Sequence, residues 1–357
     1  MPTTNGTMNK IISKSSMCSD VSRKDASMLD VRDGLCGSIN PMTSTGRNIH
    51  IFKMLFFPFI PTSILLILIS TGLHSTLIER RLLIQIHESI HSLKGINEMV
   101  HSLQLELEIV TLFLGNDSDE NVARLLSYFS NTDKALDDIS QWPKATMTLG
   151  PHFHSKGHFR SYLIRERQSI VARNMTIQNA IYFYETLNYV FIDLFTESIQ
   201  NPGNSLIWED LLALKFILRA KENTVIMLAY GQEYITSGHL PLDDHVSFIE
   251  NNALSKDNLE SCFRFKEGTE PLYHELLVLN SFNQSYLLTM ISWIIEERQG
   301  LNSLETAISW FFDATTLLTI FKEIEKSVVL AVESDVEDAF IVSSNQVSCT
   351  ANVIQFY

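Results

Sequence analysis

The sequence predicts an all-α fold in which one transmembrane helix precedes two adjacent antiparallel helical bundles. Only 14 glycines and 9 prolines occur in 357 residues, too few for the many turns of an all-β protein. From Glu79 onward, apolar residues recur every three or four positions, the spacing of amphipathic helices. The run from Met54 to Ile78 contains no Asp, Glu, Lys or Arg. About 20 such residues suffice to cross a bilayer as a helix.

Charge divides the chain into segments with different expected environments. Residues 1–53 carry a net charge of +3 and residues 79–357 carry −17, for a total of −14. Binding to nucleic-acid phosphates depends on Lys and Arg, and the main body is strongly acidic, so no nucleic-acid partner is expected. Residues 1–53 are rich in Ser, Thr, Asn and Gly without a sustained period, which predicts a disordered N-terminal tail. We expect a helical sensor body over 79–340 and an irregular C-terminal end over 341–357.

The uncharged run over 54–78 has three membrane interpretations: a signal-anchor, a signal peptide and an anchor in the inverted orientation. As a signal-anchor it makes a single-pass membrane protein, and we expect residues 79–357 outside the cell. As a signal peptide translated from Met54 it would be cleaved near Ser70 and Gly72, small residues that suit a cleavage site. Within 20 residues on either side, two basic residues precede the run and three follow it. The positive-inside rule therefore leaves the inverted orientation open.

N-glycosylation sequons occur on both sides of the run. Those at Asn116, Asn174 and Asn283 follow it, as an extracellular body requires, whereas the one at Asn5 precedes it. Sequons therefore permit an extracellular body without supporting it.

The body is expected to contain a series of helices. The first carries Leu103 and Leu107 on its apolar face and ends at Gly115. The others are expected near residues 117–142, 158–173, 177–199, 205–236, 242–254, 256–265, 269–281, 285–297 and 303–335. Asn302 with Glu305 resembles a capped start for the last of them. Because one four-helix bundle cannot accommodate so many helices, we expect two.

One string in the first body helix suggests metal chemistry. His87-Glu88-Ser89-Ile90-His91 matches the HExxH pattern, in which two histidines on one helix face bind zinc and the glutamate is a general base. The longer metzincin pattern does not follow, and a third ligand would have to come from His101, Glu106 or Glu108. A membrane-associated zinc peptidase is therefore the alternative function, and a solvated stalk helix is the favoured interpretation.

Two further groups of polar residues have plain interpretations. His152, His154 and His158 lie in one short segment and suggest either a metal-binding loop or an exposed loop, of which we favour the second. Lys221 and Glu222 interrupt an apolar helix and are interpreted as a solvated charge pair on one face. No Gly-rich phosphate loop, nucleophile elbow or kinase motif occurs, so no catalytic residue, metal or cofactor is expected.

Four short motifs follow one another in the body. They are Leu103-Gln-Leu-Glu106, Asn131-Thr-Asp-Lys-Ala-Leu with Trp142, Ala180-Ile-Tyr-Phe-Tyr-Glu185, and Leu218-Arg-Ala-Lys-Glu222 followed by Ala229-Tyr-Gly. Their order and spacing over about two-thirds of the chain resemble the NIT domain, the nitrate- and nitrite-sensing module of receptors. The resemblance implies two adjacent helical bundles, in agreement with the helix pattern.

The resemblance also implies a ligand site between two helices, at Gln104, Leu107, Lys221, Glu222 and Leu228. The family holds its anion with two arginines, and Leu107 and Leu228 stand in their places. A buried anion needs charge-assisted donors, each contributing about 1.5–3 kcal/mol, which leucine cannot supply. We therefore expect the sensor architecture without nitrate or nitrite binding by the family's arginine chemistry.

In animals the resembled domain is the extracellular part of receptor guanylate cyclases, between two transmembrane helices. Here a second membrane segment and a cyclase are absent, so we expect a truncated product or fragment of such a receptor rather than a complete enzyme (a lyase). The expected partners are the membrane, an unknown small ligand and a second copy of the chain. Dimerisation through the stalk and the last long helix is expected by analogy with such receptors.

Overall fold

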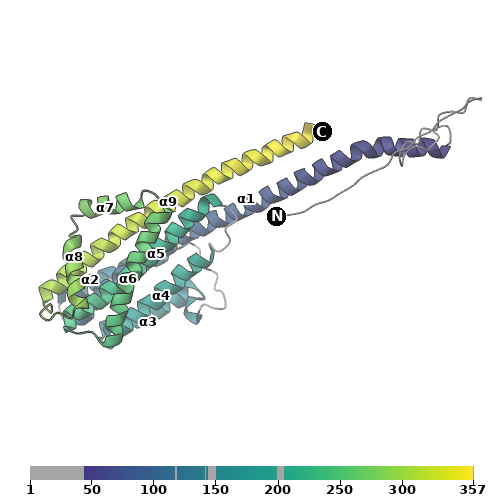
Figure 1. Cartoon of the computed structure of the whole chain (residues 1–357). Helices are drawn as coiled ribbons and strands as arrows, with labels where there is room; N and C mark the ends of the chain where they lie inside the picture. Colours follow the sequence, from purple (N-terminus) through teal and green to yellow (C-terminus); the bar gives the residue numbers. More distant parts are fainter. Residues whose placement is uncertain (1–43, 117–118, 141, 144–149, 199–204, 357) are drawn as a thin grey trace, which may run out of the picture. The chain divides into compact units, whose positions relative to one another are not determined.

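The structure is a computed structural model that describes residues 44–116, 119–140, 142–143, 150–198 and 205–356. Within those ranges every regular element is helical, which confirms the predicted all-α class (Figure 1). In chain order the elements are α1 (Ser44–Gly115), α2 (Asp119–Asp138), η1 (Pro151–Phe153), α3 (Lys156–Val171), α4 (Ile177–Ser198), α5 (Ser205–Ser237), α6 (Leu242–Phe265), α7 (Thr269–Leu279), α8 (Gln284–Ile295) and α9 (Leu304–Phe356).

The chain divides by its internal contacts into two units, Met1–Ile67 and Leu68–Tyr357, and α1 contains residues of both. One segment of α1, Arg47–Ile84, is long and apolar enough to cross a membrane. Its apolar side chains are largely exposed, as in a helix that needs an apolar solvent.

Helix α1 begins earlier in the chain than expected. Residues 44–53 were expected to belong to a disordered tail, but α1 begins at Ser44 and they are helical. Residues 1–43 lie outside the described part of the chain. Helix α1 continues through Pro58 and Pro61. The Thr62 hydroxyl, one residue past the second proline, donates to the carbonyls of Pro58 at 3.0 Å and Phe59 at 2.9 Å.

The helical body contains the two bundles. The C-terminal part of α1 packs with α2, α3 and α4, and α5 packs with α6 and α9, which α7 and α8 accompany. Helices α4 and α5 are antiparallel, since Gln178 and Asp193 of α4 bond to Glu233 and Arg219 of α5, respectively. Figure 1 shows α9 alongside α1, and the ion pair of Lys94 with Glu333 joins these two helices.

Helix α5 is the central element of the body. All six side chains from Thr224 to Ala229 are buried. Six consecutive residues point in all directions around a helix, whereas a helix packed on one side buries a single stripe. The helix is therefore covered on several sides. At Gly231 the indole ring of Trp310 lies so close that a Cβ atom would overlap it. The Trp310 Nε1–H group donates to the carbonyl of Leu228 at 2.9 Å, which holds α9 against α5.

Two helices are longer than expected. Residues 242–254 and 256–265 form the single helix α6, because Ser255 faces inward and bonds to Thr224 instead of ending the helix. Helix α9 continues past residue 335 and through 341–356, a segment that was expected to be irregular. Its sequence contains neither Gly nor Pro, so it lacks the strongest helix breakers.

Candidate functional site

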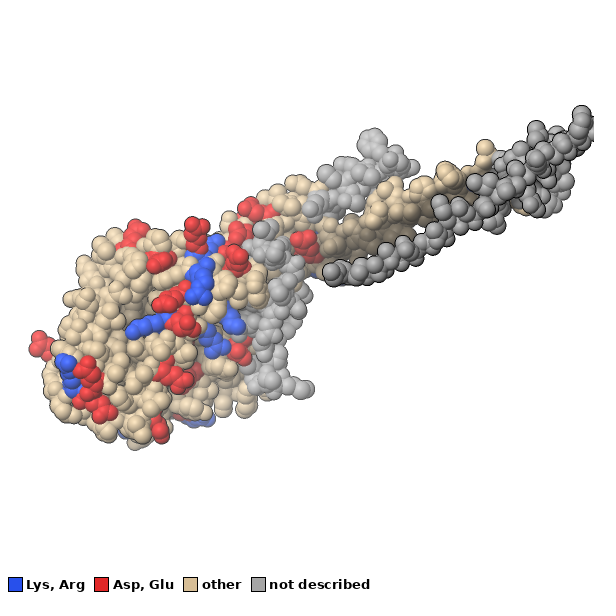
Figure 2. All heavy atoms as spheres, in the orientation of Figure 1, with Lys and Arg blue, Asp and Glu red and all other residues tan. Residues whose placement is uncertain are grey.

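Most charged side chains of the body lie at its surface. Figure 2 shows acidic and basic side chains interspersed on the face that it draws, where water solvates them. A few charged side chains are instead buried between helices. A buried charge is costly unless it is paired, so these groups and their partners define the candidate site.

Two of the residues implied by the family resemblance meet between α1 and α5. Gln104 Nε2 donates to Glu222 Oε2 at 2.6 Å, and both side chains are buried. Burial raises the pKa of Glu222 to about 7, although the hydrogen bond from Gln104 opposes the shift. The two motifs are 118 residues apart in sequence, and this contact joins them directly.

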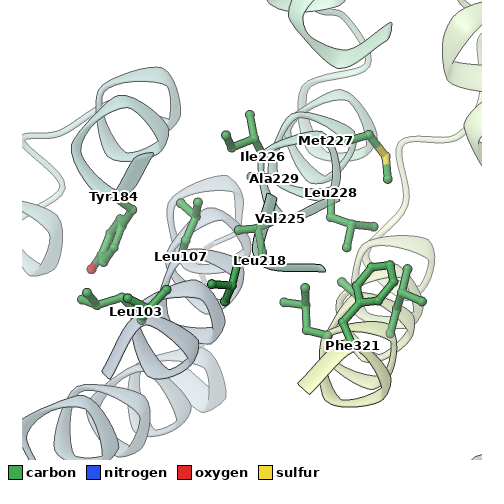
Figure 3. Packing of buried hydrophobic residues seen from close by; sticks show 14 of the residues in the cluster. Leu103, Leu107, Tyr184, Leu218, Val225, Ile226, Met227, Leu228, Ala229 and Phe321 are labelled. Atoms are coloured by element: carbon green, nitrogen blue, oxygen red, sulfur yellow. The ribbon is translucent and has the colours of Figure 1, made fainter. Parts of the chain in front are cut away.

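Leu107 and Leu228, which the resemblance places where the family has arginines, lie in the apolar core. Leu107 and Leu228 are both 0% exposed. In Figure 3, Leu107 lies between α1 and α5, close to Val225, and Leu228 extends from α5 toward Phe321 of α9. Hydrocarbon therefore occupies both positions, and neither provides a donor for an anion.

A third implied residue, Lys221, is part of a buried ion-pair network. Its Nζ donates to Glu325 Oε2 at 2.9 Å, and the two side chains are 1% and 2% exposed. Lys322 bonds to the other oxygen of Glu325 at 3.1 Å and to Glu98 at 3.0 Å. Burial alone would raise the pKa of Glu325, but the two lysines lower it. The interpretation of Lys221 and Glu222 as a solvated surface pair is therefore wrong.

A second buried network surrounds Glu106 of α1. Arg167 of α3 binds its carboxylate with two hydrogen bonds, Nε to Oε1 at 2.8 Å and Nη2 to Oε2 at 2.5 Å. The Tyr184 hydroxyl donates to the same carboxylate at 2.6 Å, and Arg167 Nη1 donates to Asp133 at 2.7 Å. Burial works against the charge of Arg167, but the bonds to Glu106 outweigh it and raise the pKa of the guanidinium.

Neither network was identified from the sequence, although a partial signal exists. Glu106 lies between the apolar residues Leu103 and Leu107, and Lys221 follows Leu218 and Ala220; a charged side chain so close to a predicted apolar face can be buried with it. Their partners Arg167 and Glu325 lie 61 and 104 residues further along the chain. No local pattern identifies partners at such separations.

The described residues of the HExxH string and its possible third ligands form no metal site. His87 is exposed, and the side chains of Glu88 and His91 lie outside those described. Of the possible third ligands, Glu106 is bound to Arg167, and burial beside two lysines lowers the pKa of His101 to about 2. The third, Glu108, is fully buried, which raises its pKa.

The histidines of the loop do not converge either. The His152 ring stacks on Tyr162 with centroids 4.0 Å apart, and His158 Nδ1 lies 2.7 Å from Ser155 Oγ. Among the described residues, no three His, Cys, Asp or Glu side chains gather as a metal site requires.

The decisive comparison is with protein families. Residues 98–333, more than half of the chain, match the family profile described as "Nitrate and nitrite sensing" (NIT). The chain belongs to the NIT family. One solved structure, the "Structure of the NasR transcription antiterminator", is similar to this NIT domain with a TM-score of 0.56 and 15% sequence identity. The match covers 73% of this chain and 72% of that one, and at this identity it establishes the fold alone. No curated protein matches the chain.

Proposed function

We propose that this protein is a membrane-anchored NIT sensor domain in which hydrocarbon closes the pocket that holds an anion elsewhere in the family. The complete burial of Leu107 and Leu228 carries this proposal. An anion placed between them would lose its hydration and gain no charged donor, and such transfers cost several kcal/mol or more.

Among the described residues, the arginine that is buried already has partners. Arg167 uses three of its nitrogens on Glu106 and Asp133, and its guanidinium stacks on the Phe129 ring at 4.5 Å. Nitrate could bind there only by displacing a carboxylate that would then be buried and unpaired. The arrangement therefore supports a sensor that responds to an input other than nitrate or nitrite.

Helix α1 supplies the route by which such an input would reach the membrane. It contains both the apolar segment Arg47–Ile84 and the buried contacts of Gln104 and Glu106. A shift of α5 against α1 would break or remake the bond between Gln104 and Glu222, and α1 would carry the displacement along its length. An extracellular body, a dimer and an origin in a receptor guanylate cyclase complete the proposal, each resting on analogy with the family.

The proposal is tested by thermal unfolding of the detergent-solubilised full chain in nitrate, nitrite or chloride at equal ionic strength. A ligand that binds only the folded state raises the midpoint of unfolding. We expect the same midpoint in all three salts. A higher midpoint in nitrate or nitrite that disappears in Arg167→Gln or Arg219→Gln would refute the proposal, because it would identify a working anion site.

A further inference from the structure

A cavity of about 570 Å³ lies between α1, α2 and α9, away from the two leucines. Its apolar lining comes from Gly95 of α1, Ala135 of α2, and Val329 and Leu330 of α9. Small-molecule sites in proteins typically measure about 300–1,000 Å³ and combine an apolar lining with a few polar groups. Nitrate has only four heavy atoms and would leave most of this space empty.

The charged groups of the cavity include one more cation than anions. Four lysines line it, Lys94, Lys134, Lys322 and Lys326, against three acidic residues. Two of those acids, Glu98 and Glu325, are already paired with Lys322. Lys322 therefore offsets the negative charge of these two acids.

Lys134 is the cation best placed to meet a ligand. It is exposed on α2 and has no ion pair with any residue that the structure describes, whereas the other three lysines of the cavity each have one. Its ammonium group can therefore bind an anion without first breaking an internal bond. A lysine is suited to a single carboxylate as a compact point charge.

We propose that this cavity binds a small organic carboxylate. The hydrocarbon part of the ligand rests on Ala135, Val329 and Leu330, and the carboxylate lies at Lys134. A neutral analogue of the same shape loses the charge-assisted bond, and a bulkier side chain at Ala135 occupies the space of the hydrocarbon part.

The wall of this cavity is connected to the family motifs. Glu325 lines the cavity and accepts a hydrogen bond from Lys221, whose neighbour Glu222 is bonded to Gln104 of α1. A ligand would contact α1, α2 and α9 at once and bias their spacing. That this ligand is the input of the sensor rests on the proposed function, whereas binding of the ligand to the cavity does not.

The test is calorimetric titration of 4-phenylbutyrate, and of the uncharged 4-phenylbutyramide, into the detergent-solubilised full chain. We expect saturable one-to-one binding of the carboxylate and at least about tenfold weaker binding of the amide, the loss of one charge-assisted contact. Lys134→Gln should weaken carboxylate binding by about tenfold, and Ala135→Leu should abolish it.

Two matched variants serve as controls on the exposed surface of α6. Lys256→Gln and Ala253→Leu introduce the same changes away from the cavity and should bind like the parent protein. If Ala135→Leu lowers the unfolding midpoint, the exposed Lys134→Gln variant decides the question alone. The proposal is overturned by absent binding of the carboxylate, by equal binding of the amide, or by unchanged affinity in Lys134→Gln. Nitrate binding would refute the proposed function and leave this inference intact.

Discussion

The two ends of the family motif on α5, which begins at Leu218 and reaches Ala229, have different surroundings. Lys221 and Glu222 are buried among charged and amide groups, whereas Leu228, about two turns further along the helix, is buried in hydrocarbon. The charged side chains of Lys221 and Glu222 bond to other side chains of the protein, whereas Leu228, at the position where the resemblance implies an arginine, offers no donor. In this protein the polar residues of the motif therefore form structural bonds between helices.

The largest loss of stability is expected when one member of the buried ion pair between Lys221 and Glu325 is removed. Glu325→Leu leaves Lys221 buried without its principal partner and should lower the free energy of unfolding by about 3–5 kcal/mol. Urea denaturation of the full chain in detergent measures the loss. The double variant Lys221→Met with Glu325→Leu should recover most of it, because no charge is then stranded. A loss below about 1 kcal/mol in the single variant would mean that the pair is solvated.

The apolar packing around Leu228 is tested by truncating this side chain. Leu228→Ala should lower the free energy of unfolding by about 2–5 kcal/mol, through lost burial and the cavity left behind. The control is Leu254→Ala, at an exposed leucine of α6, which should change stability by no more than about 0.5 kcal/mol. Equal small effects in urea denaturation would contradict the packed core around Leu228.

Protonation of Glu222 should make stability depend on pH. Its pKa is raised to about 7 in the folded state, so the folded protein binds a proton that the unfolded chain releases above its ordinary pKa of 4.5. This stabilising contribution is complete below pH 4.5 and is lost as pH rises toward 7.

Glu222→Gln keeps a neutral side chain at every pH and removes this dependence. Relative to the parent protein, the variant should gain about 1–3 kcal/mol of unfolding free energy between pH 5 and pH 8. Urea denaturation at several pH values measures the difference. Parallel stability curves for the two proteins would show that Glu222 titrates normally.

An expected effect of similar size concerns the contact between α5 and α9. In an exposed helix, Gly→Ala stabilises by about 1 kcal/mol, but at Gly231 the added methyl group overlaps the Trp310 ring. Gly231→Ala should therefore destabilise the protein by about 1–3 kcal/mol. The same change at Gly157 of α3, where a Cβ atom meets only Ser155 at 3.9 Å, is the control and should be neutral or stabilising. A stabilising Gly231→Ala change in thermal unfolding would disprove the close approach.

Much of the helical fold follows from local sequence patterns, because apolar spacing and turn residues are local signals. The ends of helices were less predictable. Ser255 looked like an interruption but faces a buried hydroxyl, and α9 continues to Phe356 through Ser, Thr and Asn residues that have only modest helix propensity.

The candidate site could be predicted only in part. The motifs indicated that Gln104 and Glu222 belong to one region, and their hydrogen bond joins them. The burial of Lys221 was missed, because the identity of its partner Glu325 depends on how α5 and α9 pack, 104 residues apart. The cavity beside Lys134 was missed for the same reason, since three separate helices form it.

The most direct test of the central claim is calorimetric titration of nitrate into the detergent-solubilised full chain. Because Leu107 and Leu228 are buried in hydrocarbon, we expect no saturable heat at millimolar nitrate. Saturable heat in the parent protein that is lost in Arg167→Gln, with folding intact, would contradict it, since an arginine would then hold the anion after all.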